Sequence, residues 1–471
     1  MSFAELEPLI GFEVHVQVNC REKLFCSCPT DYLNVPPNTN VCPICTGQPG
    51  AKPMPPNAYA IRAALAVSMM LNCEVRVGEH IYWLRKHYPY PDLPKGYQII
   101  SQPIGVNGCV KFRFGSETRE VRIREVHVEE DAGRWDPESG RVDYNRCGVP
   151  LIEIVTHPDM RSPEEARAFA DSLLRILKYL NCVRVEGTRF DTNVSIKGGA
   201  RVEIKNINSV KGVFKALLFE ISRQRSLMAK GLSVKRETRH FDEDSMITIP
   251  MRVKETVEDY RYIPDPDLYP FVVTQRLYDE VKSSLPESPY VRLMRFIREY
   301  GLSFDDAYVL TSEYELANFF EEVAKHVPVD VAAKWVRYEV KRELNYRDLP
   351  ASEIPISPQQ LVKLIRLVES GEITVPAAKK VIGLMFDERL DPEVIVERYG
   401  LRRKVDLRAL GEAIELALEK YPKAVKDYKS GNEKAIFFLV GKVKEALSSR
   451  VEPQLILRML KERLEEMSCG S

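Results

Sequence analysis

The chain has 471 residues, 44% of them hydrophobic, and its 68 basic and 68 acidic side chains give a formal net charge of zero. This length predicts about three domains, and the zero charge excludes a global attraction to nucleic acid, so any RNA contact must come from local basic patches. The sequence has no apolar run of about eighteen residues and no basic, apolar leader at its N-terminus, so we expect a cytoplasmic protein without a membrane-spanning helix.

The first predicted element is a half-buried strand over residues 8–19. Apolar and polar side chains alternate there, and Glu13 and His15 fall on the polar side. Both residue types bind metals or contact phosphates, but the same alternation also describes an ordinary solvent face. The strand therefore offers a candidate working surface that needs support from the rest of the chain.

Four cysteines follow within residues 20–50, in a segment whose loop has too few apolar residues to fold alone. Ten cysteines in a long cytosolic chain favour metal binding or free thiols over a disulfide scaffold. Two short cysteine pairs separated by a loop match a structural zinc ribbon with a closed tetrahedral site, and Cys20 is an outside candidate for a ligand. The four expected zinc ligands are Cys26, Cys28, Cys42 and Cys45.

Residues 57–71 predict a core helix with Asn57 as its N-cap. The next segment, residues 83–103, is rich in aromatic residues, prolines and bases. The prolines fix its backbone, and tyrosine hydroxyls and lysine amines project from it. Such a segment is either a stiff surface spacer or the polar lining of a passage.

Residues 124–153 form an acidic run that holds several candidate metal-binding carboxylates. Three acids are adjacent, Glu129, Glu130 and Asp131, and Glu153 stands alone in an apolar stretch. A carboxylate in such a stretch is costly to bury unless a metal or a cation offsets its charge. Two acidic clusters joined by a polar turn suit a magnesium–phosphate site; the alternative is a solvated edge strand with Glu153 salt-bridged at a sheet end.

The sequence Ser-Pro-Glu-Glu from Ser162 predicts the start of a helix that continues to about Leu180. Ser162 is the expected N-cap, and Glu165 is expected to complete a capping box. A further helix is predicted over residues 209–230. The apolar stripes of these helices indicate core packing.

Between these two helices, residues 189–208 predict a β-hairpin. Pairing apolar with apolar side chains places Val194 opposite Ile204 and Ile196 opposite Val202, with a three-residue loop that contains glycine. The other face is either a second polar working surface or a plain solvent face. It gathers Asp191, Asn193, Ser195, Glu203 and Lys205.

From about residue 289 the sequence has helical periodicity, with interruptions at Pro328, Pro350 and Pro358. A last helical unit has a small excess of basic residues, which fits either a weak RNA-binding surface or a solvated helical face. The expected domains are residues 1–288, 289–400 and 401–471.

The glycine-rich phosphate loops of common nucleotide-binding folds are absent, as is the G-x-S-x-G nucleophile elbow. If the chain acts on a nucleotide, metal ions and basic side chains on a sheet must hold the phosphates.

Ten stretches are specific enough to compare with a known family: IGFEVHVQ (10–17), NVCPICTGQPGAKP (40–53), RKHYPYPDLPKGYQIISQP (85–103), HVEEDAGR (127–134), VDYNRCGVPLIEIVTHPD (142–159), EGTRFDTNVS (186–195), EIKNINS (203–209), DYRYIPDPDL (259–268), DYKSGNEKAIFFLVGKV (427–443) and EPQLILRML (452–460). The chain resembles the B subunit of tRNA-dependent amidotransferases, the GatB family, over essentially its whole length. It departs at Arg134, where Lys is usual, at Cys147, where a small residue is usual, and at 448–453, which lack the family's Gly and Asn. The related E subunit carries a large inserted domain for which this chain has no room.

The resemblance implies an α+β fold of the glutamine synthetase type: a curved antiparallel sheet with carboxylates on its concave face and an inserted zinc ribbon, followed by an all-α helical domain and a small helical tail domain. It implies that ATP phosphorylates the side-chain carboxylate of misacylated Glu-tRNA(Gln) or Asp-tRNA(Asn), and that ammonia then displaces phosphate. A partner amidase, the A subunit, would release ammonia from glutamine, and a small C subunit would brace the pair in a heterotrimer. The helical and tail domains would hold the tRNA.

The same resemblance assigns roles to individual residues. The expected magnesium ligands are Glu13, His15, Glu129, Glu153 and Asp191. The expected catalytic set is Glu129, Glu130, Glu153, Asn193, Ser195, Glu203 and Lys205. The expected ammonia channel contains Lys86, Tyr88, Tyr90, Asp92, Lys95, Tyr97 and Gln98.

Two other functions stay open on the sequence. A non-catalytic tRNA-binding scaffold would keep the fold while a partner does the chemistry, but here every member of the acidic set is present. A metal-dependent hydrolase would need a zinc site with an open position, and the cysteine set matches a closed one.

Overall fold

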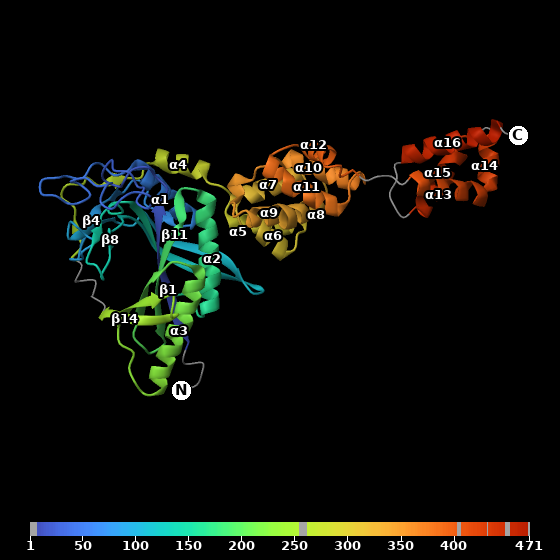
Figure 1. Ribbon diagram of the computed structural model, residues 1–471. Helices are drawn as coiled ribbons and strands as arrows, with labels where there is room; N and C mark the ends of the chain where they lie inside the picture. The colour runs from blue at the N-terminus through green and yellow to red at the C-terminus, as the bar shows by residue number, and fades with distance from the viewer. Residues whose placement is uncertain (1–6, 254–260, 403–406, 431, 448–452, 470–471) are drawn as a thin grey trace. The chain divides into compact units, whose positions relative to one another are not determined.

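The computed structural model describes residues 7–253, 261–402, 407–430, 432–447 and 453–469. Contacts divide the chain into two compact units, Met1–Gly301 with Thr311–Tyr314, and Leu302–Leu310 with Glu315–Ser471. All strands of the described residues belong to the first unit (Figure 1). The division at Gly301 differs from the boundary expected at residue 288, and the three-domain division stays a prediction.

A twelve-stranded sheet forms the centre of the first unit. Its strands follow the order β14-β13-β12-β11-β1-β10-β7-β5-β4-β15, and β6 pairs with both β7 and β2. Two small sheets pair β3 with β16 and β8 with β9. The strands are β1 (Pro8–Val18), β2 (Glu74–Val75), β3 (His80–Ile81), β4 (Trp83–His87), β5 (Tyr97–Ser101), β6 (Gly105–Phe114), β7 (Glu117–Glu130), β8 (Arg134–Trp135), β9 (Val142–Asp143), β10 (Pro150–Thr156), β11 (Val183–Ile196), β12 (Val202–Ile207), β13 (Glu237–Asp242), β14 (Ile247–Val253), β15 (Ile263–Pro264) and β16 (Phe271–Val272).

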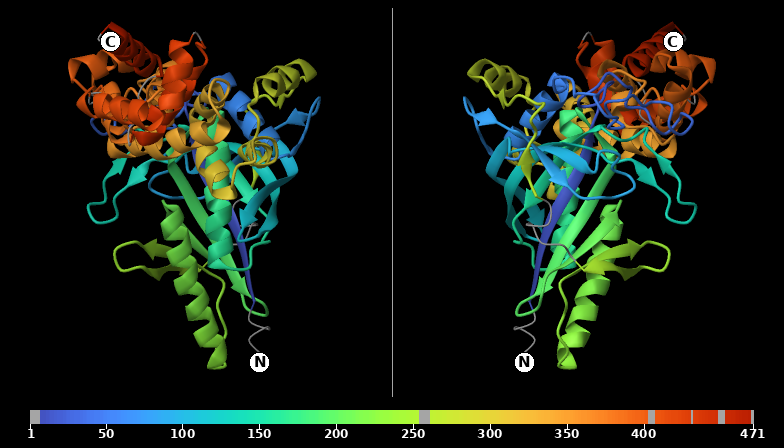
Figure 2. Two further views of the ribbon diagram at one scale, coloured as in Figure 1. Left: turned by 90° about the vertical axis from the view of Figure 1, so that its right-hand side faces the viewer. Right: turned by 90° about the vertical axis from the view of Figure 1, so that its left-hand side faces the viewer.

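The prediction of an antiparallel sheet is wrong for one pair, because β12 and β13 run parallel. Parallel neighbours need a crossover connection, and α3 (Val210–Ala229) supplies it between these two strands. Figure 2 shows α3 as a long helix beside the β13–β14 hairpin. The first unit therefore contains a mixed sheet with helices, as an α+β fold requires.

Three helices, α1 (Ala58–Met70), α2 (Pro163–Leu180) and α3, share one apolar core with one face of the sheet. Phe12 of β1 lies at the centre of this core, with its ring centroid 5.8 Å from those of both Phe169 and Phe190. Side chains alternate along β1, so when Phe12 is buried in the core the polar residues of β1 point to the other face of the sheet. The core therefore determines which side of the sheet carries the polar residues.

The helix starts confirm most of the local predictions. Asn57 caps α1 by accepting hydrogen bonds from the backbone N–H groups of the next turn, and Ser162 and Ser209 cap α2 and α3. The capping box at α2 is wrong by one residue, because Glu165 Oε2 accepts from the N–H of Arg161 at 2.7 Å instead of from that of Ser162.

The predicted hairpin exists, but its register is wrong by two residues. Val194 lies opposite Val202, not Ile204. The chain turns earlier than expected because Gly198 adopts a φ of +89°, and Gly199 N–H donates to Ile196 O at 2.7 Å. A shift of two residues keeps each side chain on its predicted face, so the polar face of the hairpin is retained.

The remaining described elements are helical, as the periodicity predicts, and α5 and α10 begin at prolines. Residues of α13, α15 and α16 pack around an apolar core that includes Leu410, Leu439 and Leu460. No described helix is long and apolar enough to cross a membrane. The helices are α4 (Gln275–Ser284), α5 (Pro289–Tyr300), α6 (Phe304–Leu310), α7 (Tyr314–Ala324), α8 (Val329–Lys334), a π-helix (Trp335–Val340), α9 (Lys341–Tyr346), a 3₁₀-helix (Ala351–Glu353), α10 (Pro358–Glu369), α11 (Val375–Glu388), α12 (Pro392–Arg398), α13 (Leu407–Lys420), α14 (Pro422–Lys429), α15 (Ala435–Ala446) and α16 (Pro453–Cys469).

Candidate active site

Four adjacent strands, β11, β1, β10 and β7, place polar side chains in one row across the sheet. His15 of β1 lies opposite Arg189 of β11 on one side and Glu153 of β10 on the other. Glu153 in turn lies opposite His127 of β7. Cross-strand partners point to the same face. The row therefore joins the first predicted strand to the acidic run, although they are far apart in the sequence.

His15 is the centre of a charged cluster in this row. Its Nε2 lies 3.5 Å from Glu153 Oε1 and 3.6 Å from Glu129 Oε1. Burial opposes the charge on His15, but the two carboxylates outweigh it and raise the pKa of His15 to about 9. The imidazole is therefore a cation at neutral pH in this state.

The two carboxylates of this cluster differ in their electrostatics. Burial and the neighbouring charge of Glu153 raise the pKa of Glu129 to about 7. Burial also disfavours the charge on Glu153, but its hydrogen bond with His15 holds the pKa of Glu153 well below the usual range. Burial disfavours the charge on Lys86 of β4. The negative charges of Glu153 and Glu129 outweigh burial and raise the pKa of Lys86. Groups with divergent pKa values are frequent at catalytic sites.

A second acidic cluster lies one step along the same face. Oxygen atoms of Glu13, Asp191 and Glu203 all come within 4.8 Å of one another. Asn193 Nδ2 donates to Glu13 Oε1 at 3.0 Å, while the buried Asn193 Oδ1 has no hydrogen-bond partner among the described residues. Lys205 Nζ donates to Asp191 Oδ2 at 3.2 Å, and Asp191 raises the pKa of Lys205 well above its usual value.

This second cluster fits a magnesium ion on its donor set. Three carboxylates supply hard oxygen ligands, and Asn193 Oδ1 offers a further oxygen to which no described residue donates. Glu203 is held in place by Thr238, whose hydroxyl donates to its Oε2 at 2.9 Å. The structure thus groups Glu203 with Glu13 and Asp191, and it groups His15 with Glu129 and Glu153.

Glu130 lies apart from both clusters, because consecutive residues of a strand point to opposite faces. Its Oε1 accepts hydrogen bonds from Lys95 Nζ and, at 3.1 Å, from the N–H of Ile99. Glu130, Lys95 and Tyr97 line a cavity that also reaches Cys45. Ser195 is also separate from the two acidic clusters, because it lies farther along β11, opposite Leu9 of β1.

The segment predicted as a channel is divided between the two faces. Lys86 lies opposite Gln98, on the face that carries Glu129, and Tyr88 donates from its hydroxyl to Gln98 Oε1 at 3.2 Å. Gln98 Nε2 also donates to Glu130 O at 2.8 Å. The other members are Tyr90, whose ring lies 5.6 Å from that of Trp135, and Asp92, whose carbonyl accepts from the N–H of Gly133 at 2.9 Å.

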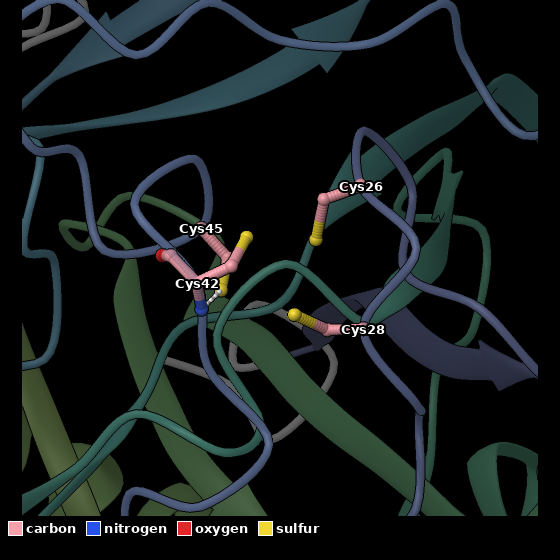
Figure 3. A group of neighbouring side chains, drawn as sticks. All are labelled: Cys26, Cys28, Cys42 and Cys45. Carbon is pink, nitrogen blue, oxygen red and sulfur yellow. Dashed lines mark hydrogen bonds between the residues drawn. The ribbon is translucent and has the colours of Figure 1, made fainter.

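The four predicted zinc ligands come together on two facing loops (Figure 3). The sulfur atoms of Cys26, Cys28, Cys42 and Cys45 all lie within 4.8 Å of one another. Hydrogen bonding with the Cys26 thiol, with help from the charge of Lys23, lowers the pKa of Cys45 to about 4. Four sulfur donors grouped this closely suit a structural zinc site.

Two cations at these sites have no role in the predictions from the sequence. Lys23, which is almost fully buried, donates to Asn40 O at 2.8 Å and lies 3.5 Å from Cys45 Sγ. Arg189 donates from Nη2 to Asp131 Oδ1 at 2.8 Å. Nothing in the sequence around Lys23 predicts this position. Arg189 was predictable in part, because it is two residues from Asp191 and shares its face.

Comparisons with known proteins identify the family of this chain. The family described as the GatB/GatE catalytic domain matches residues 8–279, which contain both acidic clusters and the cysteine cluster, and the GatB domain matches residues 318–464. The chain belongs to the GatB family. The GatB match over both regions confirms the resemblance drawn from the sequence motifs.

Curated relatives of this GatB chain match it over nearly its whole length. A protein of Methanothermobacter thermautotrophicus is 50% identical over 96% of this chain and 99% of its own length. One of Methanopyrus kandleri is 50% identical over 97% and 98%, and one of Methanocaldococcus jannaschii is 47% identical over 97% and 98%. Each of the three is named as the B subunit of an aspartyl/glutamyl-tRNA(Asn/Gln) amidotransferase.

Proposed function

We propose that this chain activates and amidates a side-chain carboxylate carried on tRNA, as a subunit of an amidotransferase of the kind named in its relatives. The observation that supports this most is the acidic face, where two carboxylate clusters lie beside the cations Lys86, Arg189 and Lys205. Phosphoryl transfer depends mainly on alignment and on neutralising phosphate charge. A face that combines metal-binding acids with fixed cations meets both needs.

The proposed reaction has two steps. A side-chain carboxylate oxygen of misacylated Glu-tRNA(Gln) or Asp-tRNA(Asn) attacks the γ-phosphorus of ATP; a new P–O bond forms, the bond to the β–γ bridging oxygen breaks, and ADP leaves with that oxygen. Ammonia then attacks the carbonyl carbon of the acyl phosphate. The C–O bond to the phosphoryl group breaks, inorganic phosphate leaves, and the nitrogen loses a proton to give the amide.

Magnesium would be held by the carboxylates of the acidic face. Glu13, Asp191 and Glu203 would bind one ion, and Glu129 and Glu153 would bind a second. His15 would be an unusual nitrogen ligand of that second ion once its imidazolium has lost its proton. When bound, magnesium neutralises phosphate charge during the transfer. Asn193, Ser195 and Lys205 would orient the phosphates or the substrate carboxylate.

Ammonia would reach the acyl phosphate through the protein, because that intermediate must be kept from water. The cavity lined by Glu130, Lys95 and Tyr97 supports such a route, and Gln98 connects it to the acidic face through its bond to Glu130 O. In the proposed passage Lys86 and Tyr88 stand at the acidic end, and Tyr90 and Asp92 lie in the loop between β4 and β5.

The wider assembly follows from the same proposal. The sheet corresponds to a glutamine synthetase-type catalytic domain, with zinc on the four cysteines as a structural ion. An amidase A subunit would supply ammonia, and a small C subunit would complete a heterotrimer. The helical residues after 302 would hold the tRNA, with the last helices as a tail domain.

Transfer of oxygen isotope tests this proposal. The heterotrimer would be given ATP, magnesium, ammonium chloride and misacylated tRNA whose side-chain carboxylate carries ¹⁸O. Activation by phosphorylation moves one labelled oxygen into inorganic phosphate, with one label per amide formed. Amide formation with unlabelled phosphate would refute carboxylate phosphorylation.

A further inference from the structure

Arg189 has an unusual position on the acidic face. It lies on β11, opposite His15, and two residues from Asp191. Its side chain is 27% exposed, so it is not fully enclosed by the residues around it. A cation in this position faces the place where the proposed triphosphate substrate would bind.

One edge of the Arg189 guanidinium is fixed by a buried acid. Asp131, at 2% exposure, accepts from Arg189 Nη2 at 2.8 Å and from Gln17 Nε2 at 2.8 Å, and Arg146 Nε lies 3.6 Å away. Burial disfavours the charge on Asp131, but Arg189 and Arg146 hold its pKa below the usual range. Asp131 is therefore an ionised, immobile anchor.

The anchor itself is held by the loop that carries the cysteines. Gln17 Oε1 accepts from the hydroxyl of Tyr32 at 3.1 Å, and Tyr32 lies between the two cysteine pairs. Three successive hydrogen bonds thus connect that loop to Arg189 through Gln17 and Asp131. A side chain held through such a chain has lost its rotamer freedom before substrate arrives.

The other edge of the guanidinium is available to a ligand. The bond to Asp131 is the one side-chain hydrogen bond that the structure shows for Arg189 among the residues it describes. Lys205, by contrast, is engaged by Asp191 and lies 3.7 Å from Glu203. A planar guanidinium with free N–H groups matches the oxygen geometry of a phosphate better than an engaged ammonium does.

We propose that Arg189 is a catalytic residue that binds the phosphoryl group transferred from ATP, and that Asp131 is its positioning residue. This inference rests on the proposed function and adds a residue that the sequence motifs did not assign. Arg189 donates to the γ-phosphate oxygens as charge develops on them, and it then holds the same oxygens in the acyl phosphate. When ammonia displaces the phosphate, the guanidinium stabilises the leaving group.

A purely structural ion pair is the competing explanation, since buried pairs are common without a catalytic role. The two differ in what Arg189→Lys does. Lysine keeps the charge beside Asp131, so a structural role predicts near-normal stability and activity. A phosphate-binding role predicts normal stability but a large loss of kcat, because lysine cannot hold Asp131 and two phosphate oxygens in one plane.

The test uses the heterotrimer with ATP, magnesium, ammonium chloride and misacylated tRNA, so that the amidase and the passage are bypassed. Arg189→Ala should lower kcat by about 100- to 1,000-fold, the scale for one lost donor to a developing charge, with tRNA affinity unchanged. Guanidinium ion added to this variant should restore part of the rate. Arg189→Lys and Asp131→Asn should both lower kcat, and the melting temperature of Arg189→Lys should stay near that of wild type. The control is Arg201→Ala, at an exposed position on the same hairpin, and its kcat should equal that of wild type.

Two results would overturn the inference. The first is a folded Arg189→Lys variant with wild-type kcat, and the second is an Arg189→Ala variant whose loss of rate tracks a lowered melting temperature and resists guanidinium. Failure of the proposed function is distinguishable, because wild type itself would then form no amide in the same assay.

Discussion

The charge on His15 should make the stability of the folded protein depend on pH. Burial disfavours the imidazolium, but Glu153 and Glu129 raise the pKa of His15 from 6.5 to about 9 in the folded protein. The folded state therefore binds the proton more tightly than the unfolded state, so the stabilisation is complete below pH 6.5 and is lost as pH rises through 9. At about 1.4 kcal/mol per pKa unit, the loss between pH 7 and pH 9.5 is about 2 kcal/mol.

The assay compares wild type with His15→Asn, which keeps the size of the side chain but does not titrate. Urea unfolding in magnesium-free buffer, followed by circular dichroism, should show the wild-type midpoint falling more than that of the variant between pH 7 and pH 9.5. Burial and Glu153 raise the pKa of Glu129 to about 7, so Glu129 titrates at the lower end of this window, and the fall between pH 8 and pH 9.5 is the part that reports His15. Equal pH dependence in the two proteins would refute the electrostatic account of His15.

Three further predictions concern the metals and the core. Metal analysis should find one zinc per chain in wild type and none in Cys45→Ser, and the variant should have a lower melting temperature. The reason is that structural zinc contributes folding energy on the order of 10 kcal/mol in small metal sites. Wild-type protein free of zinc would contradict this prediction. Glu203→Gln should raise the magnesium concentration for half-maximal amidation by at least about 10-fold, and an unchanged requirement would remove Glu203 from the metal site. Phe12→Ala should lower the free energy of unfolding by about 3–5 kcal/mol, measured by urea denaturation, because its ring packs against Phe169 and Phe190; a loss below about 1 kcal/mol would contradict that packing.

Local patterns predicted much of the first unit. Alternation along β1 identified the polar face that carries Glu13 and His15, and the caps Asn57 and Ser162 marked helix starts that the structure confirms. These features depend on neighbours in the sequence. They are set by side-chain period and by backbone hydrogen bonding, so a single sequence reveals them.

The grouping of the acids was beyond local patterns. Glu203 joins Glu13 and Asp191 because β11 pairs with both β1 and β12, an arrangement that alternation alone does not specify. The separation of Glu130 from Glu129 follows from the period of a strand and was available in the sequence. The position of Lys23 depends on how the cysteine loop folds back on the sheet, for which the sequence offers no signal.

The central claim is that the acidic face of this chain performs the ATP-dependent amidation. Glu129→Gln in the proposed heterotrimer, assayed with ATP, magnesium and ammonium chloride, tests it most directly. Glu120→Gln, on the exposed part of the same strand, is the control. The account predicts that Glu129→Gln binds misacylated tRNA normally and loses at least about 100-fold in amidation rate, while the control is unchanged. Amidation by Glu129→Gln at the wild-type rate would contradict the claim and move the chemistry away from this cluster.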